Sequence, residues 1–140
     1  MQTLDAEDEC PVRDRFFMPA EWSRHARTWM QWPCRVGPWG NPDAMTAARL
    51  AYRDVARTIS RFEPVTMVVR PQDRAEAQLA LGAGIQLFEG LIDDSCARDS
   101  GPTFLIDGEG GRAGIQWRFN AWGTKYTPYD NDATIATRIL

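Results

Sequence analysis

The sequence is poor in the residues from which metal centres and disulfide frameworks are built. It has three cysteines, at positions 10, 34 and 96, no C-x-x-C pair, and one histidine, His25. A single histidine cannot form a multi-histidine metal site, and the cysteine spacing matches neither a zinc site nor a thioredoxin-like motif. We therefore expect no metal. One disulfide stays open as an alternative, but reduced thiols in a cytoplasmic protein are favoured.

The sequence also lacks a basic character and a long apolar run. Its 16 Lys and Arg are outnumbered by 19 Asp and Glu, which gives a net charge of −3. Nucleic-acid binders usually present a basic face, and a membrane-spanning helix needs about 18 or more apolar residues in succession. We therefore expect neither a nucleic-acid partner nor a membrane span.

What the sequence does contain is enough apolar material for one folded domain. Of its 140 residues 44% are hydrophobic, with six Trp and six Phe. The N-terminus turns acidic after four residues, which is unlike a secretory signal. We predict a flexible acidic extension over residues 1–15 and a folded part over residues 16–140.

Strands and helices alternate along the folded part. Short apolar runs predict strands at 28–32, 65–69, 85–88 and 103–106, and the alternation of Ile115, Trp117 and Phe119 predicts another at 115–119. A glycine-rich stretch at 107–111 predicts a hairpin turn. This order of elements indicates a mixed α/β architecture of the α+β type.

Three helices are predicted between these strands. The first begins at Asn41 and Pro42, and its apolar face is predicted to hold residues 44, 48, 51, 55, 59 and 62. The second covers 73–81, and a third follows the cap region at 130–132 with Ile135 and Ile139 on one face. Because this last helix has barely begun at Leu140, we expect a fragment of a longer protein.

The densest group of charges lies at residues 93–102, which read Asp-Asp-Ser-Cys-Ala-Arg-Asp-Ser-Gly-Pro. A planar guanidinium presents a fork of N–H donors that two carboxylate oxygens match, which makes Asp93 and Asp99 candidates for binding such a cation. The alternative is a solvated turn in which Arg98 pairs with its acidic neighbours.

Neither Cys96 nor His25 is favoured as a catalytic group. A reactive cysteine needs a lowered pKa, and the carboxylates beside Cys96 raise it. A lone histidine is more often structural, and nothing in the sequence places His25 near Asp99.

A second dense stretch, residues 120–126, reads Asn-Ala-Trp-Gly-Thr-Lys-Tyr. It fits either the wall of a pocket or an aromatic loop packed under the core, with Gly123 in a turn conformation, because pockets and cores use the same residues.

Several blocks of the sequence resemble the signature of agmatine deiminases, in the family's order and with similar spacing. They cover nearly everything from Met18 onwards, at residues 18–22, 28–30, 32–33, 62–67, 93–95, 98–103, 119–123 and 125–126. The resemblance implies the pentein fold, a five-bladed propeller of ββαβ units. It also implies a hydrolase acting on the C–N bonds of linear amidines, which converts agmatine to N-carbamoylputrescine and ammonia in putrescine biosynthesis, without a cofactor.

In that family a Cys thiolate attacks the guanidinium carbon, a covalent thiouronium forms, and a His acts as general acid and base. By resemblance Asp99 matches the carboxylate that grips the guanidinium, and Asp93 matches a second site position near the amine end or the pocket wall. Cys96 stands where the family usually has a pocket-lining Trp, and Thr124 stands where a Gly is usual. The substrate-binding candidates are therefore Asp93, Cys96 and Asp99.

The family's nucleophilic Cys and catalytic His match no residue of this sequence. By resemblance the chain is the N-terminal portion of a pentein catalytic domain, about the first two blades of five. We therefore expect no catalytic residue in it and no deiminase activity from the isolated chain. Family members are typically homo-oligomers that act on a small molecule, here agmatine. The alternatives are a non-catalytic remnant or binding module, or a peptidyl-arginine deiminase-like enzyme.

Overall fold

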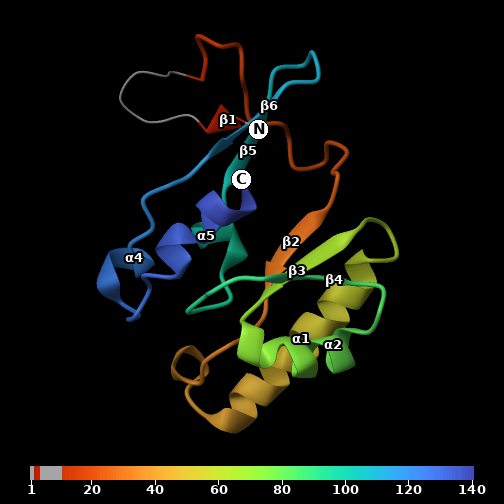
Figure 1. Cartoon of the computed structure of the whole chain (residues 1–140), viewed down its shortest axis with the longest axis vertical. Coiled ribbons are helices and arrows are strands. Elements are labelled where there is room, and N and C mark those ends of the chain that lie inside the picture. Colours follow the sequence, from red (N-terminus) through yellow and green to blue (C-terminus); the bar gives the residue numbers. More distant parts are fainter. Residues whose placement is uncertain (1, 4–10) are drawn as a thin grey trace.

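The chain folds into two small sheets with helices around them (Figure 1). The computed structural model describes residues 2–3 and 11–140. One sheet is parallel, with strands β2 (Thr28–Gln31), β3 (Val65–Val69) and β4 (Gln86–Glu89) in that order. The other has the order β1 (Gln2–Thr3), β6 (Arg112–Ile115), β5 (Thr103–Ile106), with β5 and β6 antiparallel. The predicted mixed α/β class is confirmed.

Two helices connect the parallel strands. Helix α1 (Pro42–Ile59) follows a 3-10 turn (η1, Gly37–Trp39), and helix α2 (Arg74–Leu81) follows another (η2, Pro71–Asp73). The Asn41 side chain accepts a hydrogen bond from the Ala44 N–H at 2.8 Å, and Pro42 is the first helical residue, as predicted. Three shorter helices follow, α3 (Ala97–Ser100), α4 (Ala121–Thr124) and α5 (Asp132–Ile139).

Strand β3 lies at the centre of the core, and all five of its residues are buried. Because side chains alternate along a strand, Val65, Met67 and Val69 pack with α1 and α2, whereas Val68 faces the opposite layer with Ile135 of α5. Figure 1 shows α1 and α2 beside the sheet and α5 at a separate position across it. The parallel sheet is therefore covered on both faces.

Helix α5 approaches the sheet closely at Gly90. A Cβ atom at this position would lie 2.9 Å from Ile135 Cδ1 and 3.0 Å from Val68 Cγ1. Any larger residue would push these side chains aside, and Ile135 is completely buried in the contact. The helix predicted from Ile135 and Ile139 is thus confirmed.

The predicted strand at 115–119 is wrong. The turn at 107–111 is a hairpin turn, as predicted, and it sets Arg112 opposite Ile106. All four residues of β5 therefore pair with residues 112–115, and residues 116–120 belong to no strand. The Phe119 ring instead packs edge-to-face against the rings of Trp122 and Tyr129.

The predicted apolar face of the first helix is only partly right. Of the predicted face Ala48 is buried, but Ala51 and Val55 are exposed, and the buried Ala56 was not predicted. The helix ends at Ile59, so Phe62 lies beyond it with 81% of its surface exposed. Proline disfavours the helical conformation of the residue before it, so the helix cannot continue through Glu63 and Pro64 into β3.

The predicted flexible extension over residues 1–15 falls mainly outside the described residues. Gln2 and Thr3 pair with Ala113 and Gly114 of β6, while residues 1 and 4–10 are not described. The flexibility of this segment stays a prediction. Within the described residues, no helix combines the length and the apolar character that crossing a membrane requires.

Candidate functional site

The charged motif lies between β4 and β5, and the fold divides its carboxylates into two environments. Asp93 and Asp94 are buried in the loop that follows β4, whereas Asp99 is exposed on α3. The motif is therefore buried at its start and exposed at Arg98 and Asp99, before Ser100 and Gly101 are buried again.

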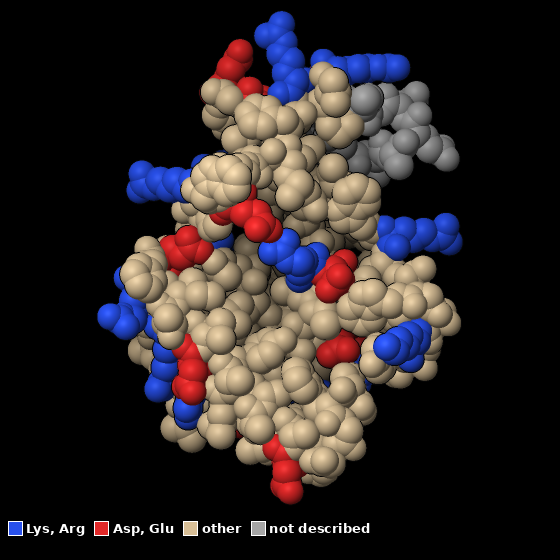
Figure 2. All heavy atoms as spheres, turned by 180° about the vertical axis from the view of Figure 1, so that it is seen from behind, with Lys and Arg blue, Asp and Glu red and all other residues tan. Residues whose placement is uncertain are grey.

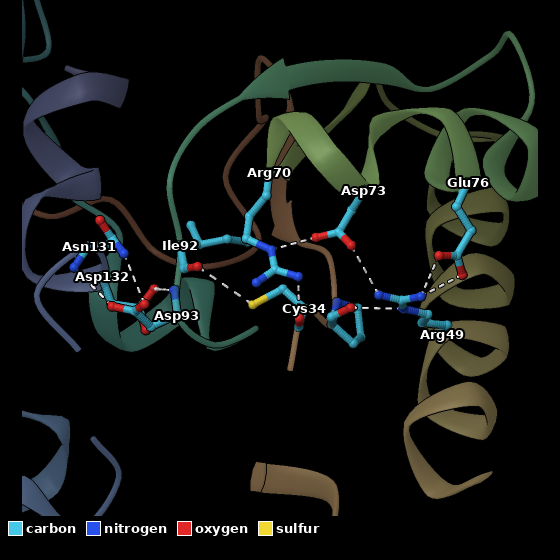
Figure 3. Close-up of polar contacts among 10 residues, drawn as sticks. Cys34, Arg49, Arg70, Asp73, Glu76, Ile92, Asp93, Asn131 and Asp132 are labelled. Atoms are coloured by element: carbon cyan, nitrogen blue, oxygen red, sulfur yellow. Dashed lines mark hydrogen bonds and ion pairs between the residues drawn. The ribbon is translucent and has the colours of Figure 1, made fainter. Parts of the chain in front are cut away.

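Asp93 is used at the buried end to hold α5 (Figure 3). Its two carboxylate oxygens accept hydrogen bonds from the backbone N–H and the side-chain amide of Asn131, both at 2.9 Å. In return the Asp93 N–H donates to Asp132 Oδ1 at 2.9 Å. This reciprocal exchange fastens the loop to the start of α5. The predicted substrate-binding role of Asp93 stays a prediction.

Asp132 is the most perturbed carboxyl group of this cluster. Burial, together with the nearby charges of Asp93 and Asp94, raises its pKa to about 6, although the hydrogen bond from the Asp93 backbone and the Arg35 guanidinium act in the opposite direction. The group is 2% exposed, so its charged form is poorly solvated.

Cys96 is partly buried immediately before α3. Burial, and then the charges of Asp94 and Asp99, raise the pKa of its thiol to about 11. The sequence-based expectation that the neighbouring carboxylates raise this pKa is confirmed. The thiol is therefore protonated at neutral pH, which is the opposite of an activated nucleophile.

Arg98 does not pair with its acidic neighbours, contrary to the solvated-turn alternative. Its guanidinium contacts the Glu21 carboxylate at 3.0 Å, and both side chains are exposed. Because Glu21 lies in the first signature block, this pair brings the segment around residues 18–22 beside α3. A groove of about 480 Å³ lies there, lined among others by Met18, Trp29 and Phe104.

Asp99 is the free carboxylate of the site. Its side chain is exposed and makes no hydrogen bond or ion pair with any residue in the described part of the chain. A second hollow of about 290 Å³ adjoins α3, lined among others by Gln31, Tyr52 and Ala97. The face opposite to that of Figure 1 has a hollow near its centre, with acidic and basic side chains gathered around it (Figure 2).

The other sequence candidates lie apart from a catalytic arrangement. His25 is exposed and pairs with Glu63 at 3.3 Å. In the aromatic stretch, Trp122 packs edge-to-face against Phe119 and Tyr126, at centroid distances of 5.5 and 6.0 Å. Gly123 adopts a left-handed conformation with φ of 79°. Residues 122–125 are exposed, so the alternative of a loop packed under the core is wrong. Among the described residues no group of three or more His, Cys, Asp or Glu could hold a metal ion.

Sequence reasoning missed the partners of the motif. The sequence predicts only a helix cap at Asn131 and Asp132, whereas their contacts with Asp93 bridge 38 and 39 residues. Gln31 and Tyr52 carried no signal at all, because they lie in a strand and a helix that were assigned from their apolar neighbours.

These features define an α/β protein. Its parallel sheet is covered by helices on both faces and is followed by a hairpin, and its candidate site is the turn between them that carries the free carboxylate. The model of the Porphyromonas-type peptidyl-arginine deiminase family matches residues 17–140. The chain belongs to this family.

Three proteins illustrate the similarity. A Streptomyces avermitilis protein named "Putative agmatine deiminase" is 48% identical over 130 residues, which are 92% of this chain and 38% of that protein. The agmatine deiminase of Stutzerimonas stutzeri is 42% identical over 135 residues, covering 93% of this chain and 36% of that protein. The solved structure titled "Agmatine deiminase of Enterococcus faecalis catalyzing its reaction" has a TM-score of 0.89 at 34% identity, over 96% of this chain and 37% of that chain.

The chain thus spans little more than a third of the length of the relatives that it matches. The likeness extends over nearly all of this chain, and it includes the motif that carries Asp99.

Proposed function

We propose that this chain supplies the guanidinium-binding N-terminal portion of an agmatine deiminase. The observation that carries the proposal is Asp99, an exposed carboxylate without a partner in the described part of the chain, on a short helix inside the family motif. A carboxylate offers two oxygens to the forked N–H groups of a guanidinium. The similarity to agmatine deiminases supports agmatine as the substrate.

The reaction we propose for the whole protein is hydrolysis of agmatine to N-carbamoylputrescine and ammonia. A Cys thiolate attacks the guanidinium carbon, ammonia leaves, and water hydrolyses the resulting thiouronium. Cys96 is unsuited to this attack because its thiol has a raised pKa. Cys34 is equally unsuited, since burial raises its pKa to about 12 and its thiol donates to the Ile92 carbonyl at 3.6 Å. Cys10 lies outside the described residues.

We further propose that the two sheets belong to the first two blades of a five-bladed ββαβ propeller. The β5–β6 hairpin and the β2-β3-β4 sheet, with its connecting helices, supply the required kinds of element. The propeller would place its active site near the centre, which fits the position of Asp99 on a turn between the two sheets. A cytoplasmic location, a homo-oligomeric state and catalysis without a cofactor are part of the same proposal. Asp93 and Cys96 are proposed as further parts of the pocket.

The test is the binding of agmatine to the purified chain, followed by the shifts of its backbone amide signals. Replacement of Asp99 by Asn removes the charge and one acceptor, and we expect agmatine binding to weaken by at least about tenfold. The control is Asp54→Asn, which alters an exposed carboxylate that pairs with Arg53 on α1. Equal binding by the Asp99 variant and the unaltered chain would contradict the proposal.

The purified chain is expected to release no ammonia from agmatine, because binding carboxylates cannot replace a nucleophile. The measurement is a sensitive ammonia assay at saturating agmatine. Steady ammonia release that Asp99→Asn abolishes would contradict this expectation.

A peptidyl-arginine deiminase activity is the second candidate, because the matching family model bears that description. Peptidyl-arginine also presents a guanidinium, so Asp99 would serve it equally. Comparing the binding of agmatine with that of an arginine-containing peptide separates the two. A chain that binds neither would support the non-catalytic alternative.

A further inference from the structure

The turn that carries Asp99 is held at both of its ends by side chains from other elements. On the N-terminal side, the Tyr52 hydroxyl on α1 donates to the Ser95 carbonyl at 3.2 Å. On the C-terminal side, the Gln31 amide on β2 donates to the Ser100 hydroxyl at 3.0 Å. The exposed residues Arg98 and Asp99 lie between these two contacts.

The Gln31 contact is part of a small buried group of hydrogen bonds. Gln31 Nε2 donates to Ser100 Oγ, and the Ser100 hydroxyl has two acceptors within reach, the Cys96 carbonyl at 3.1 Å and Gln31 Oε1 at 3.3 Å. Gln31 is 1% exposed and Ser100 is 4% exposed. A buried amide is costly unless it is satisfied, so a polar residue at this end of β2 is explained by the contact that it makes with α3.

The turn also has close contacts of its own at both ends. The Asp94 carboxylate accepts a hydrogen bond from the Ser95 N–H at 2.8 Å. At the opposite end, a Cβ atom on Gly101 would collide with the backbone carbonyl of Ala97. The backbone on both sides of Asp99 is therefore held by hydrogen bonds at Ser95 and Ser100, while its carboxylate is open to solvent.

We propose that Gln31 and Tyr52 are positioning residues that hold the backbone on either side of Asp99, and so set the place from which its carboxylate meets a guanidinium, an inference that rests on the proposed function. A bidentate contact needs the carboxylate plane to match the guanidinium plane, whereas an ammonium accepts many orientations. Groups that hold a binding side chain in its productive geometry are as important for selectivity as the side chain itself. Loss of either contact therefore lowers the preference for guanidinium over ammonium.

The experiment compares two ligands with the same four-carbon spacer. Agmatine and putrescine, which has an ammonium in place of the guanidinium, are titrated into the ¹⁵N-labelled chain. The variants are Gln31→Met and Tyr52→Phe, which keep shape and remove the hydrogen bonds. The matched controls are Gln116→Met, on a glutamine that bonds Ala133 and Thr137, and Tyr129→Phe. Asp99→Asn reports on the proposed site.

We expect each positioning variant to bind agmatine about fivefold more weakly, with putrescine changed less than about twofold. A variant that is merely less stable would weaken both ligands equally. Tyr52→Phe loses a single hydroxyl, so it keeps the test decisive if Gln31→Met does not fold.

Two results overturn different parts of the proposal. If the unaltered chain prefers agmatine and Asp99→Asn loses this preference, but Gln31→Met and Tyr52→Phe keep it, only the positioning role is overturned. If the unaltered chain does not distinguish agmatine from putrescine, the proposed function is overturned and the positioning role with it.

Discussion

Asp132 stabilises the fold through the hydrogen bond that it accepts and destabilises it through its buried charge. Its oxygen accepts the Asp93 N–H at 2.9 Å, which fixes the loop, but the group is buried beside Asp93 and Asp94. An amide at this position would keep the acceptor and remove the unfavourable charge.

We therefore expect Asp132→Asn to stabilise the chain at neutral pH. The pKa of this carboxyl is raised from 3.8 to about 6, so the native state holds its proton more tightly than the unfolded state. As pH rises from about 4 to 6, the native state loses stability of the order of 2 kcal/mol through this group. Below that range both states are protonated, and the loss is absent.

Urea unfolding of both proteins between pH 4 and pH 7 measures this effect. The advantage of Asp132→Asn should widen by about 2 kcal/mol as pH rises, since all other carboxyl groups are shared by the two proteins. An advantage that is constant over this range would show that the charge of Asp132 has no influence on stability.

At the scale of elements, a chain of ion pairs links α1 to the start of α2 (Figure 3). Arg49 contacts Glu76 at 2.6 Å and Asp73 at 3.4 Å, and its Nε–H donates to the Pro33 carbonyl at 2.9 Å. Asp73 also pairs with Arg70 at 2.5 Å. Because Arg49 and Asp73 are largely shielded from solvent, these contacts differ from ordinary surface pairs.

Replacing Arg49 by Met is expected to lower the free energy of unfolding by about 2 kcal/mol, because it leaves the Pro33 carbonyl and the buried Asp73 with fewer partners. The control is Arg53→Met on the same helix, where only an exposed pair with Asp54 is lost. Urea unfolding at pH 7 compares the two. Equal effects would mean that the buried network adds nothing beyond a surface pair.

The elements that were predicted well from sequence are those whose signals are local. Helix α1 was located from Asn41 and Pro42, and β3 from a run of apolar residues. Strand β6 was misplaced because its register depends on the length of the preceding turn and on the strand opposite. The pairing of Asp93 with Asn131 spans 38 residues, and no local pattern encodes it.

The candidate site, too, was predictable only where its signal is local. The motif singled out Asp99 as a carboxylate available to a cation, and the structure leaves it exposed. The same pattern gave no means of telling Asp93 from Asp99, because burial is decided by how α5 packs on the loop. The contacts of Gln31 and Tyr52 with the turn likewise arise only when three elements meet.

At the scale of the whole molecule, the described part of the chain exposes many large apolar side chains. Trp22 is 90% exposed and Phe62 is 81% exposed, and both line one hollow of about 720 Å³ together with Pro64. Large apolar side chains exposed close together are typical of interaction sites and of proteins that associate.

We expect the purified chain to associate as its concentration rises. Replacing Trp22 and Phe62 by Gln should shift the chain toward the monomer in sedimentation-velocity measurements, because two large exposed apolar side chains are lost. Leu79→Gln is the comparison, since it alters an exposed apolar residue on α2 outside this hollow. A chain that is monomeric at all concentrations would contradict the prediction.

The exchange between Asp93 and the start of α5 has a consequence for how the chain tolerates changes in length. These hydrogen bonds join the residues on either side of the segment 94–130. The loop after the parallel sheet is therefore attached to α5 directly, whatever the length of the segment between them. The entropic cost of closing a flexible loop rises only with the logarithm of its length. The exposed tip of the hairpin at residues 108–110 is therefore a natural place to graft a foreign peptide while the core keeps its geometry.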